Sequence, residues 1–122
     1  MRFLRVVIVS AVMVLAGVAA AQDFMRDKAE VETMLKGATL TGVYLRTQSR
    51  YVLKFGQDGT LADTSGARAR WWVSDTGQYC REWLTGRLAG NSACMDLVRD
   101  GDRISIYSNG IKVAEGELSH GS

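Results

Sequence analysis

Histidine is nearly absent from this chain of 122 residues, which has only His120, close to the C-terminus. Ser/His/Asp and Cys/His catalytic arrangements need an imidazole in the body of a domain, so we expect neither. No cluster of thiolates and imidazoles is available for zinc. Asp100-Gly101-Asp102 begins like a calcium loop, but Ile104 and a missing downstream glutamate break that pattern. The sequence therefore predicts no catalytic residues, no metal, no cofactor and no enzyme.

An excess of positive charge is also lacking. The chain has 15 Lys+Arg and 13 Asp+Glu, but Arg2 and Arg5 lie in an N-terminal segment that we expect to be removed, which leaves 13 of each. Nucleic-acid binding needs a basic footprint, so we exclude that class. Residues 46–70 are net positive by three, a mild excess typical of a solvated face.

An apolar run long enough to span a bilayer is missing as well. Arg2 and Arg5 precede one uncharged apolar run, Val6–Val18, and then the small residues of Ala19–Ala21. This order is that of a cleavable signal peptide at residues 1–21. The alternative is a membrane anchor, but a run of about 13 residues is shorter than the roughly 20 that span a bilayer. We expect a periplasmic chain from Gln22 onward with no stable membrane span.

Cysteine occurs twice, at Cys80 and Cys94. An even count in a small exported domain indicates a disulfide, and the 14-residue separation differs from the C-x-x-C spacing of redox motifs. The predicted Cys80–Cys94 bond should contribute about 3 kcal/mol to stability.

Local patterns divide the remaining chain into a helix and a β-domain. The spacing predicts a helix over Asp23–Lys36, within an N-terminal segment 22–37 that ends at Gly37. Its apolar residues fall near one face: Phe24, Val31, Met34 and Leu35. Residues 38–122 form a single disulfide-bonded β-domain, because short apolar runs alternate there with turn signals.

The expected strands cover Thr39–Arg46, Arg50–Gly56, Thr60–Asp63, Arg68–Ser74, Gln78–Leu84, Ser92–Arg99, Arg103–Ser108 and Ile111–Leu118. Each is joined to the next by a short connection, which predicts an all-β antiparallel meander of the small up-and-down, lipocalin-like barrel type. Whether the barrel closes is left open by the sequence.

Turn chemistry predicts the strand registers. Gln57–Gly59 and Asp75–Gly77 are typical three-residue hairpin loops, and Asp100-Gly101 and Asn109-Gly110 are typical two-residue loops. The opposed pairs that follow are Phe55 with Leu61, Ala69 with Trp83, Trp71 with Arg81, Val73 with Tyr79, Leu97 with Ile104, Met95 with Ile106, and Ile106 with Val113. If the disulfide joins directly opposed residues, Cys80 also lies opposite Cys94, Tyr79 opposite Met95, and Arg81 opposite Ala93.

These registers separate an apolar from a polar face. The predicted apolar face holds Trp71, Val73, Tyr79, Trp83, Met95, Leu97, Ile104, Ile106 and Val113. The opposite face holds Arg68, Arg70, Trp72, Ser74, Gln78, Glu82, Ser92, Asp96 and the disulfide. A slip of one residue would exchange the two faces, so the agreement between separate turns supports the assignment.

The first candidate binding residue is Arg81, which the registers place among Trp71, Tyr79 and Trp83 on the apolar face. A buried charge without a partner is costly, so this arginine can hold an anionic or aromatic ligand inside the barrel. The alternative is a structural arginine that stacks on a tryptophan and reaches the rim. Both interpretations stay open.

The second candidate is Trp72 on the outer face, beside Arg68 and Arg70. A tryptophan flanked by arginines has the composition of a protein-interface anchor. The alternative is that Trp72 only covers the disulfide and a neighbouring strand.

A resemblance covers about residues 37–108. Arg70-Trp71-Trp72-Val73, the run from Gly77 to Trp83, and Cys94 before Asp100-Gly101-Asp102 resemble a group of small exported proteins. These proteins belong to a domain family of unknown function found mainly in alphaproteobacteria. The resemblance implies a periplasmic β-domain and transfers no catalytic residue.

The sequence thus favours a periplasmic binding or interaction module. Its partner would be a small apolar or anionic ligand, or a periplasmic protein such as a cell-wall hydrolase. The alternative is a structural or stress-related envelope protein without a small-molecule ligand.

Overall fold

The computed structural model describes residues 23–120, which begin with an extended segment and a short helix. The predicted signal peptide, residues 1–21, lies outside the described residues. Helix α2 (Lys28–Leu35) begins after Asp27, whose carboxylate accepts a hydrogen bond of 3.1 Å from the backbone N–H of Glu30. Gly37 follows the helix at a φ of 74°, where a glycine is favoured.

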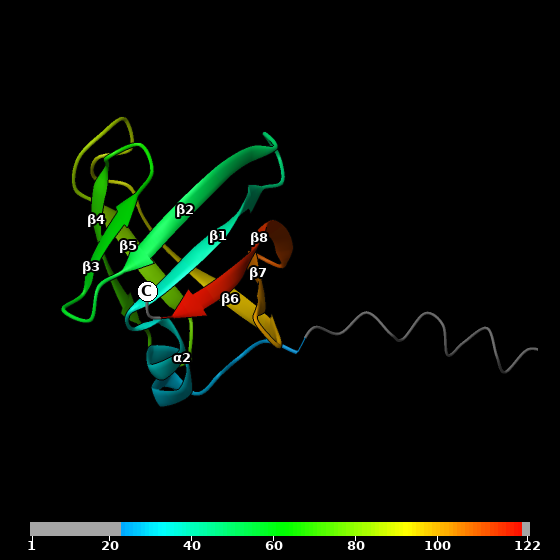
Figure 1. Cartoon of the computed structure of the whole chain (residues 1–122). Coiled ribbons are helices and arrows are strands. Elements are labelled where there is room, and N and C mark those ends of the chain that lie inside the picture. Colours follow the sequence, from blue (N-terminus) through cyan, green and yellow to red (C-terminus); the bar gives the residue numbers. More distant parts are fainter. Residues whose placement is uncertain (1–22, 121–122) are drawn as a thin grey trace, which may run out of the picture.

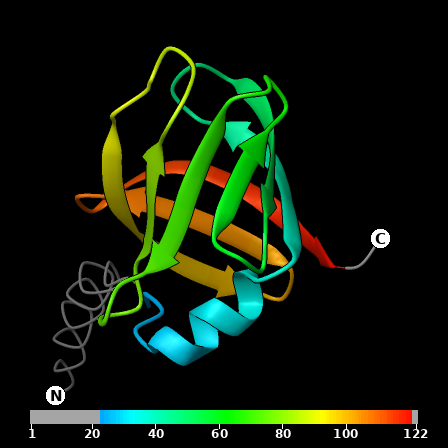
Figure 2. The same ribbon diagram turned by 90° about the vertical axis from the view of Figure 1, so that its left-hand side faces the viewer.

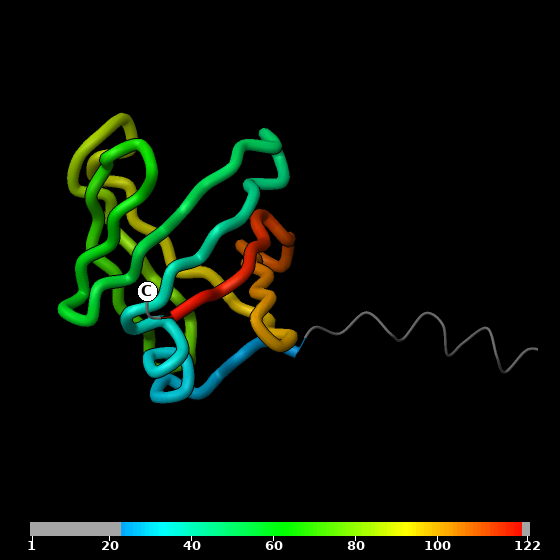
Figure 3. The backbone as a smooth tube through the Cα atoms, viewed as in Figure 1, coloured from blue at the N-terminus to red at the C-terminus, as the bar shows by residue number. Residues whose placement is uncertain are grey.

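The predicted helix start at Asp23 is wrong, because residues 23–27 run extended against the barrel (Figure 3). The backbone N–H of Met25 donates to the carbonyl of Leu97 at 2.8 Å, and the Phe24 ring lies 5.2 Å from that of Tyr107. Contacts with the strands therefore override the local helical pattern, and the helix starts only where Asp27 can cap it. Within residues 23–120, no helix combines the length and hydropathy that a bilayer crossing requires.

Eight antiparallel strands follow, in sequence order around the barrel. They are β1 (Ala38–Tyr44), β2 (Ser49–Phe55), β3 (Thr60–Asp63), β4 (Arg68–Val73), β5 (Tyr79–Trp83), β6 (Ser92–Asp100), β7 (Arg103–Ser108) and β8 (Ile111–His120). Because β1 pairs with β8 as well as with β2, the meander closes into a barrel (Figure 1). The predicted all-β fold is confirmed, and the question of closure is answered.

The registers around the candidate residues agree with the prediction. Trp71 lies opposite Arg81, and Cys80 lies opposite Cys94 in a disulfide bond. The other confirmed pairs are Phe55 with Leu61, Ala69 with Trp83, Val73 with Tyr79, Tyr79 with Met95, and Arg81 with Ala93.

The register of β6 with β7 differs from the prediction by two residues. Gly101 takes the first position of the turn, so Asp100 pairs with Arg103. Leu97 consequently lies opposite Ile106 instead of Ile104. The predicted pair of Met95 with Ile106 is wrong for the same reason. An even shift keeps the same residues on each face, so the predicted faces survive it.

The register of β7 with β8 also differs. Ser108 pairs with Ile111 across the predicted Asn109-Gly110 loop, but an irregularity between Ile106 and Tyr107 offsets the rest of the ladder by one residue. Ala114 therefore lies opposite Ile106, and Val113 is only half-buried against the core. The bulge moves one residue out of the ladder, which turn chemistry could not predict.

The core fills the interior of the barrel. Apart from Val113, every residue of the predicted apolar face is buried, and the aromatic rings of Phe55, Trp71 and Tyr79 pack edge to face at centroid distances of 5.4 Å. Gly42 and Gly116 lie opposite each other on β1 and β8, close to the hydroxyl of Tyr51. A Cβ at Gly42 would overlap the backbone of Glu115, so this seam requires glycine.

The two ends of the barrel differ. Helix α2 lies across one end, which we call the helix end, and buries Val31, Met34 and Leu35 there (Figure 2). The opposite end, the loop end, is formed by the connections 45–48, 64–67, 84–91 and 109–110. No helix of residues 23–120 covers the loop end, so polar side chains on the inner face can meet water there.

Candidate functional site

Arg81 is the charged residue at the centre of the candidate site. Strand alternation puts Tyr79, Arg81 and Trp83 on the inner face of β5, as predicted. Arg81 is half-buried, and its Nη1 donates a hydrogen bond of 3.2 Å to the Oδ1 of Asn91. Its guanidinium carbon lies 5.6 Å from the ring centroid of Trp83. The side chain therefore extends toward the loop end, where Asn91 closes the connection 84–91.

The charge of Arg81 has no acidic partner in the described part of the chain. No carboxylate of residues 23–120 lies within the 4.0 Å of an ion pair from its guanidinium. The neutral Asn91 amide uses one of the five guanidinium N–H groups, and the Trp83 ring adds a cation–π contact. Donors remain available for an anionic group in the planar geometry that carboxylates and phosphates match.

Trp83 contributes a second donor without a partner. Its ring is 4% exposed, and within residues 23–120 its Nε1 is a buried side-chain nitrogen that has no hydrogen-bond partner. Such a donor costs about 1–3 kcal/mol. The ring centroid of this indole lies 5.6 Å from the guanidinium carbon of Arg81, but the buried Nε1 itself is out of reach of solvent.

Tyr44 and Tyr79 are near enough to Arg81 for its charge to affect their pKa values. Burial raises the pKa of Tyr79, while the Arg81 charge lowers it and the neighbouring Tyr44 and Tyr51 raise it further. The pKa of Tyr44 is also raised, by burial first, with an opposing effect of Arg81 and a reinforcing effect of Asp63. At neutral pH the tyrosines are therefore neutral hydroxyls that can donate or accept hydrogen bonds beside the arginine.

These neighbours are placed by contacts across the barrel. Tyr51 lies over the Gly42 seam, and its hydroxyl donates to the carbonyl of Glu115 at 3.3 Å. The Tyr44 ring lies 4.5 Å from the Tyr51 ring. Asp63 accepts hydrogen bonds from the backbone N–H and the hydroxyl of Ser65, so its carboxylate has hydrogen-bond partners other than Arg81.

Four residues of this site were missed by the sequence analysis: Tyr44, Tyr51, Asp63 and Asn91. A signal for three of them exists. Tyr44 continues the alternation Leu40, Gly42, Tyr44; Tyr51 precedes Leu53 and Phe55 at the same spacing; and Asp63 follows Leu61 by two residues. Period-two alternation extended to the strand ends would have placed them on the inner face. Asn91 lies in a loop, where no periodicity applies.

The structure separates the six predicted site residues into three groups. Arg81 and Trp83 come together at the loop end. Tyr79 is buried deeper, and Trp71, although directly opposite Arg81, donates from Nε1 to the carbonyl of Gly56 at 3.0 Å, toward the helix end. Trp71 is therefore a core residue whose polar atom points away from the site.

Arg70 and Trp72 lie on the outer face of the barrel, where the Arg70 guanidinium contacts both the Trp72 ring and the Glu82 carboxylate. Arg70 Nε donates to the Glu82 carboxylate at 2.8 Å, and its guanidinium carbon lies 5.0 Å above the Trp72 ring. Trp72 is 36% exposed and stands beside Cys80, which is fully buried although it belongs to the outer face. This arrangement favours the interpretation that Trp72 covers the disulfide.

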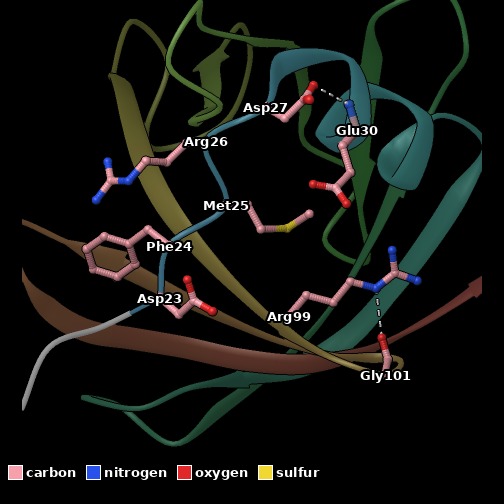
Figure 4. A pocket seen from close by; sticks show the side chains of 8 residues that line it. All are labelled: Asp23, Phe24, Met25, Arg26, Asp27, Glu30, Arg99 and Gly101. Atoms are coloured by element: carbon pink, nitrogen blue, oxygen red, sulfur yellow. Dashed lines mark hydrogen bonds between the residues drawn. The ribbon is translucent and has the colours of Figure 1, made fainter. Parts of the chain in front are cut away.

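The concave features described for residues 23–120 lie at the helix end, and one of them is a hollow beside the segment 23–27 (Figure 4). It is open to solvent and lies between the segment 23–27, α2 and the β6–β7 turn. Two of its polar groups are occupied locally, since Asp27 caps α2 and Arg99 Nε donates to the Gly101 carbonyl at 2.9 Å. Its lining combines arginines with the carboxylates of Asp23, Asp27 and Glu30, so it suits an anionic ligand less well than Arg81 does.

Metal binding has no support among residues 23–120, where no three His, Cys, Asp or Glu side chains are grouped to hold an ion. The one histidine, His120, pairs through Nε2 with the Met34 carbonyl at 2.9 Å, at the helix end. The resemblance to exported alphaproteobacterial proteins stays a prediction. Comparison of the chain with family models, curated proteins and solved structures finds no match.

Proposed function

We propose that the protein is an exported binding module whose loop end holds a small ligand with an anionic group, contacted by Arg81. The observation that carries this proposal is the half-buried Arg81, which has no carboxylate partner within residues 23–120. An oxyanion would accept hydrogen bonds from the free guanidinium N–H groups, which water at a partly closed site replaces less completely.

The ligand would carry an apolar or aromatic body beside its anionic group. The ring of Trp83 lies beside Arg81, Tyr44 is 38% exposed at the same end, and the deeper interior is filled by buried side chains. The ligand would therefore lie at the mouth of the barrel rather than deep inside it. Neutral tyrosine hydroxyls would supply further hydrogen bonds.

The proposed location is the periplasm. Support comes from the signal-peptide pattern of residues 1–21 and from the Cys80–Cys94 disulfide, since such bonds form and persist in oxidising compartments.

A binding role is proposed in preference to catalysis. General acid–base chemistry most often uses histidine, and His120 lies at the helix end, bonded to a carbonyl. The tyrosines near Arg81 have raised pKa values, which makes them weak acids at neutral pH and poorly suited to proton transfer.

Native mass spectrometry of protein purified from its own periplasm tests the proposal. A retained small molecule with an acidic group, absent from an Arg81→Met variant prepared in the same way, is the expected result. A wild-type protein that carries nothing, and that binds none of a panel of carboxylates, sulfonates and phosphates, would contradict it.

A second candidate function is a structural or stress-related envelope protein without a ligand. The filled interior favours it, because the edge-to-face packing of Phe55 with Trp71 and Tyr79 leaves the core occupied by the protein's own side chains. The Asn91 and Trp83 contacts of Arg81 would then be purely structural. In that case Arg81→Met would lower stability without changing the binding of any anion.

A further inference from the structure

Two leucines stand in solvent at the loop end. Leu84 is 52% exposed and Leu88 is 50% exposed, on the connection 84–91 between β5 and β6. The loop is fastened to the barrel, because the Leu84 N–H donates to the Arg68 carbonyl at 2.8 Å and the Arg68 N–H donates to the Thr85 hydroxyl at 2.9 Å. The leucines are therefore held outward by an anchored loop and have no core to enter.

Arginines accompany these leucines. The four connections of the loop end carry Arg46 and Arg87 and contain no acidic residue. Arg50, the second residue of β2, and Arg68, the first residue of β4, are both exposed. Asp63 at the end of β3 adds one negative charge, so these four arginines and Asp63 together are net positive by three. The rim of the loop end thus combines exposed leucines with an excess of positive charge.

The helix end has the opposite charge. Its segments 23–37, 56–59, 74–78 and 101–102 contain seven acidic residues against three basic ones. The acidic residues are Asp23, Asp27, Glu30, Glu32, Asp58, Asp75 and Asp102, and the basic ones are Arg26, Lys28 and Lys36. Charge is therefore distributed unevenly along the barrel, positive at the loop end and negative at the helix end, although residues 22–122 have a formal net charge of zero. A polarised molecule turns its positive end toward an anionic surface.

We propose that the loop end docks the protein reversibly on an anionic lipid bilayer. Leu84 and Leu88 would enter the boundary between headgroups and acyl chains, while Arg46, Arg50 and Arg87 contact lipid phosphates. Exposed apolar side chains flanked by basic ones are the composition that binds membrane interfaces. The inference rests on exposed rim residues and not on Arg81, so it is independent of the proposed ligand site.

Other occupants fit these observations less well. Two copies that met loop end to loop end would bring like charges together. A stable protein interface buries about 800 Å² on each partner, whereas the exposed large apolar side chains of the loop end are four: Tyr44, Leu84, Leu88 and Ile111. Insertion of a few apolar side chains at a charged surface needs no such area. Head-to-tail association with the acidic helix end is the remaining alternative, and the test separates it.

The test is co-sedimentation with vesicles at low salt. The form of the protein used in the assay spans residues 22–122. It lacks the apolar run at residues 6–18 and keeps every core residue described within 23–120. Vesicles of equal parts phosphatidylglycerol and phosphatidylcholine should bind the protein, and pure phosphatidylcholine should not. Molar salt should release it, because the Debye length falls to about 3 Å.

Two double variants probe the rim, and a third serves as the matched control. Arg46→Gln with Arg87→Gln should weaken binding about 30-fold, since each arginine contributes about 1 kcal/mol at an anionic surface and 1.4 kcal/mol is a factor of ten. Leu84→Ser with Leu88→Ser should weaken it by a similar factor. Lys36→Gln with Lys54→Gln, which removes the same charge from exposed positions near the helix end, should leave binding within about twofold.

Several outcomes would overturn the proposal. Absence of binding to phosphatidylglycerol vesicles at low salt would do so, as would equal binding to phosphatidylcholine. An equal loss in the helix-end control would show an unspecific charge effect. Concentration-dependent dimers that the Arg46 and Arg87 changes abolish, without vesicle binding, would assign the rim to a second copy of the chain. The melting temperature of each of the three variants should equal that of the wild type, which excludes misfolding as the cause of a loss of vesicle binding.

Discussion

Replacement of Arg81 by methionine separates a ligand-binding arginine from a structural one. The change removes the 3.2 Å hydrogen bond to Asn91 and the contact with Trp83, which contribute about 1 kcal/mol each at a partly exposed site. Asn91 is exposed, so water can replace the lost donor. Methionine keeps most of the side-chain volume and relieves the desolvation of the charge. We therefore expect the free energy of unfolding to change by no more than about 1 kcal/mol.

Binding should respond much more strongly than stability. A suitable probe is 8-anilinonaphthalene-1-sulfonate, whose fluorescence rises in apolar sites and whose sulfonate can meet the guanidinium. A charged hydrogen bond contributes about 2 kcal/mol, so Arg81→Met should lower the affinity for this probe about 30-fold. N-phenyl-1-naphthylamine has the same rings without the sulfonate, and its affinity should stay within about twofold. Arg81→Lys keeps the charge but not the planar fork, and should lie between wild type and Arg81→Met.

An equal loss of affinity for both probes in Arg81→Met would contradict an anion-binding role, because the arginine would then matter only for the shape of the site. The same role is contradicted if Arg81→Met unfolds well below wild type while sulfonate binding is unchanged, which is the signature of a structural arginine. Chemical denaturation and probe titration on the same preparations give both quantities.

Three further predictions concern the scaffold. The Cys80→Ser, Cys94→Ser double variant should lose about 3 kcal/mol in chemical denaturation, and unreduced, denatured wild type should show no labelled thiol. Trp71→Ala should cost about 3–5 kcal/mol and Trp72→Ala clearly less, since Trp71 is 6% and Trp72 is 36% exposed; equal losses would show that the faces are misassigned. Burial raises the pKa of Tyr51 above its ordinary 10.0, so the unfolded chain releases that proton first and stability should fall as pH rises above about 10. Tyr51→Phe should flatten this alkaline loss, and an unchanged slope in that variant would contradict the assignment.

Turn chemistry predicted most of the fold because each hairpin loop fixes a register over several residues. The Asp75–Gly77 loop alone places Trp71 opposite Arg81, and it was confirmed. The Asp100-Gly101 loop shows the limit of this reasoning. A glycine can occupy either position of a two-residue turn, and here Gly101 takes the first position, which leaves Asp100 opposite Arg103. The helix start was missed for a different reason, since the Met25 amide bonds to a strand far along the chain.

The candidate site was predicted only in part, because it is assembled across the barrel. One strand, β5, contributes the residues that sequence reasoning found, Arg81, Tyr79 and Trp83. Tyr44 comes from β1, four strands away from β5 in sequence order, and its approach to Arg81 depends on curvature and closure of the barrel. Pairing of neighbouring strands can be read from turns, but closure joins strands that are far apart in sequence. Residues on opposite walls therefore could not be brought together beforehand.

The position of the site follows from how the two ends of the barrel are covered. Inner-face residues at the helix end are apolar, because α2 places Val31, Met34 and Leu35 over them and excludes water. An arginine there would lose its hydration without a partner. At the loop end the same inward alternation meets water, so Arg81 is tolerated on an inner face at that end. Covering one end of the barrel with a helix therefore leaves the other end as the place where a charged group can be both inward-facing and reachable by a ligand.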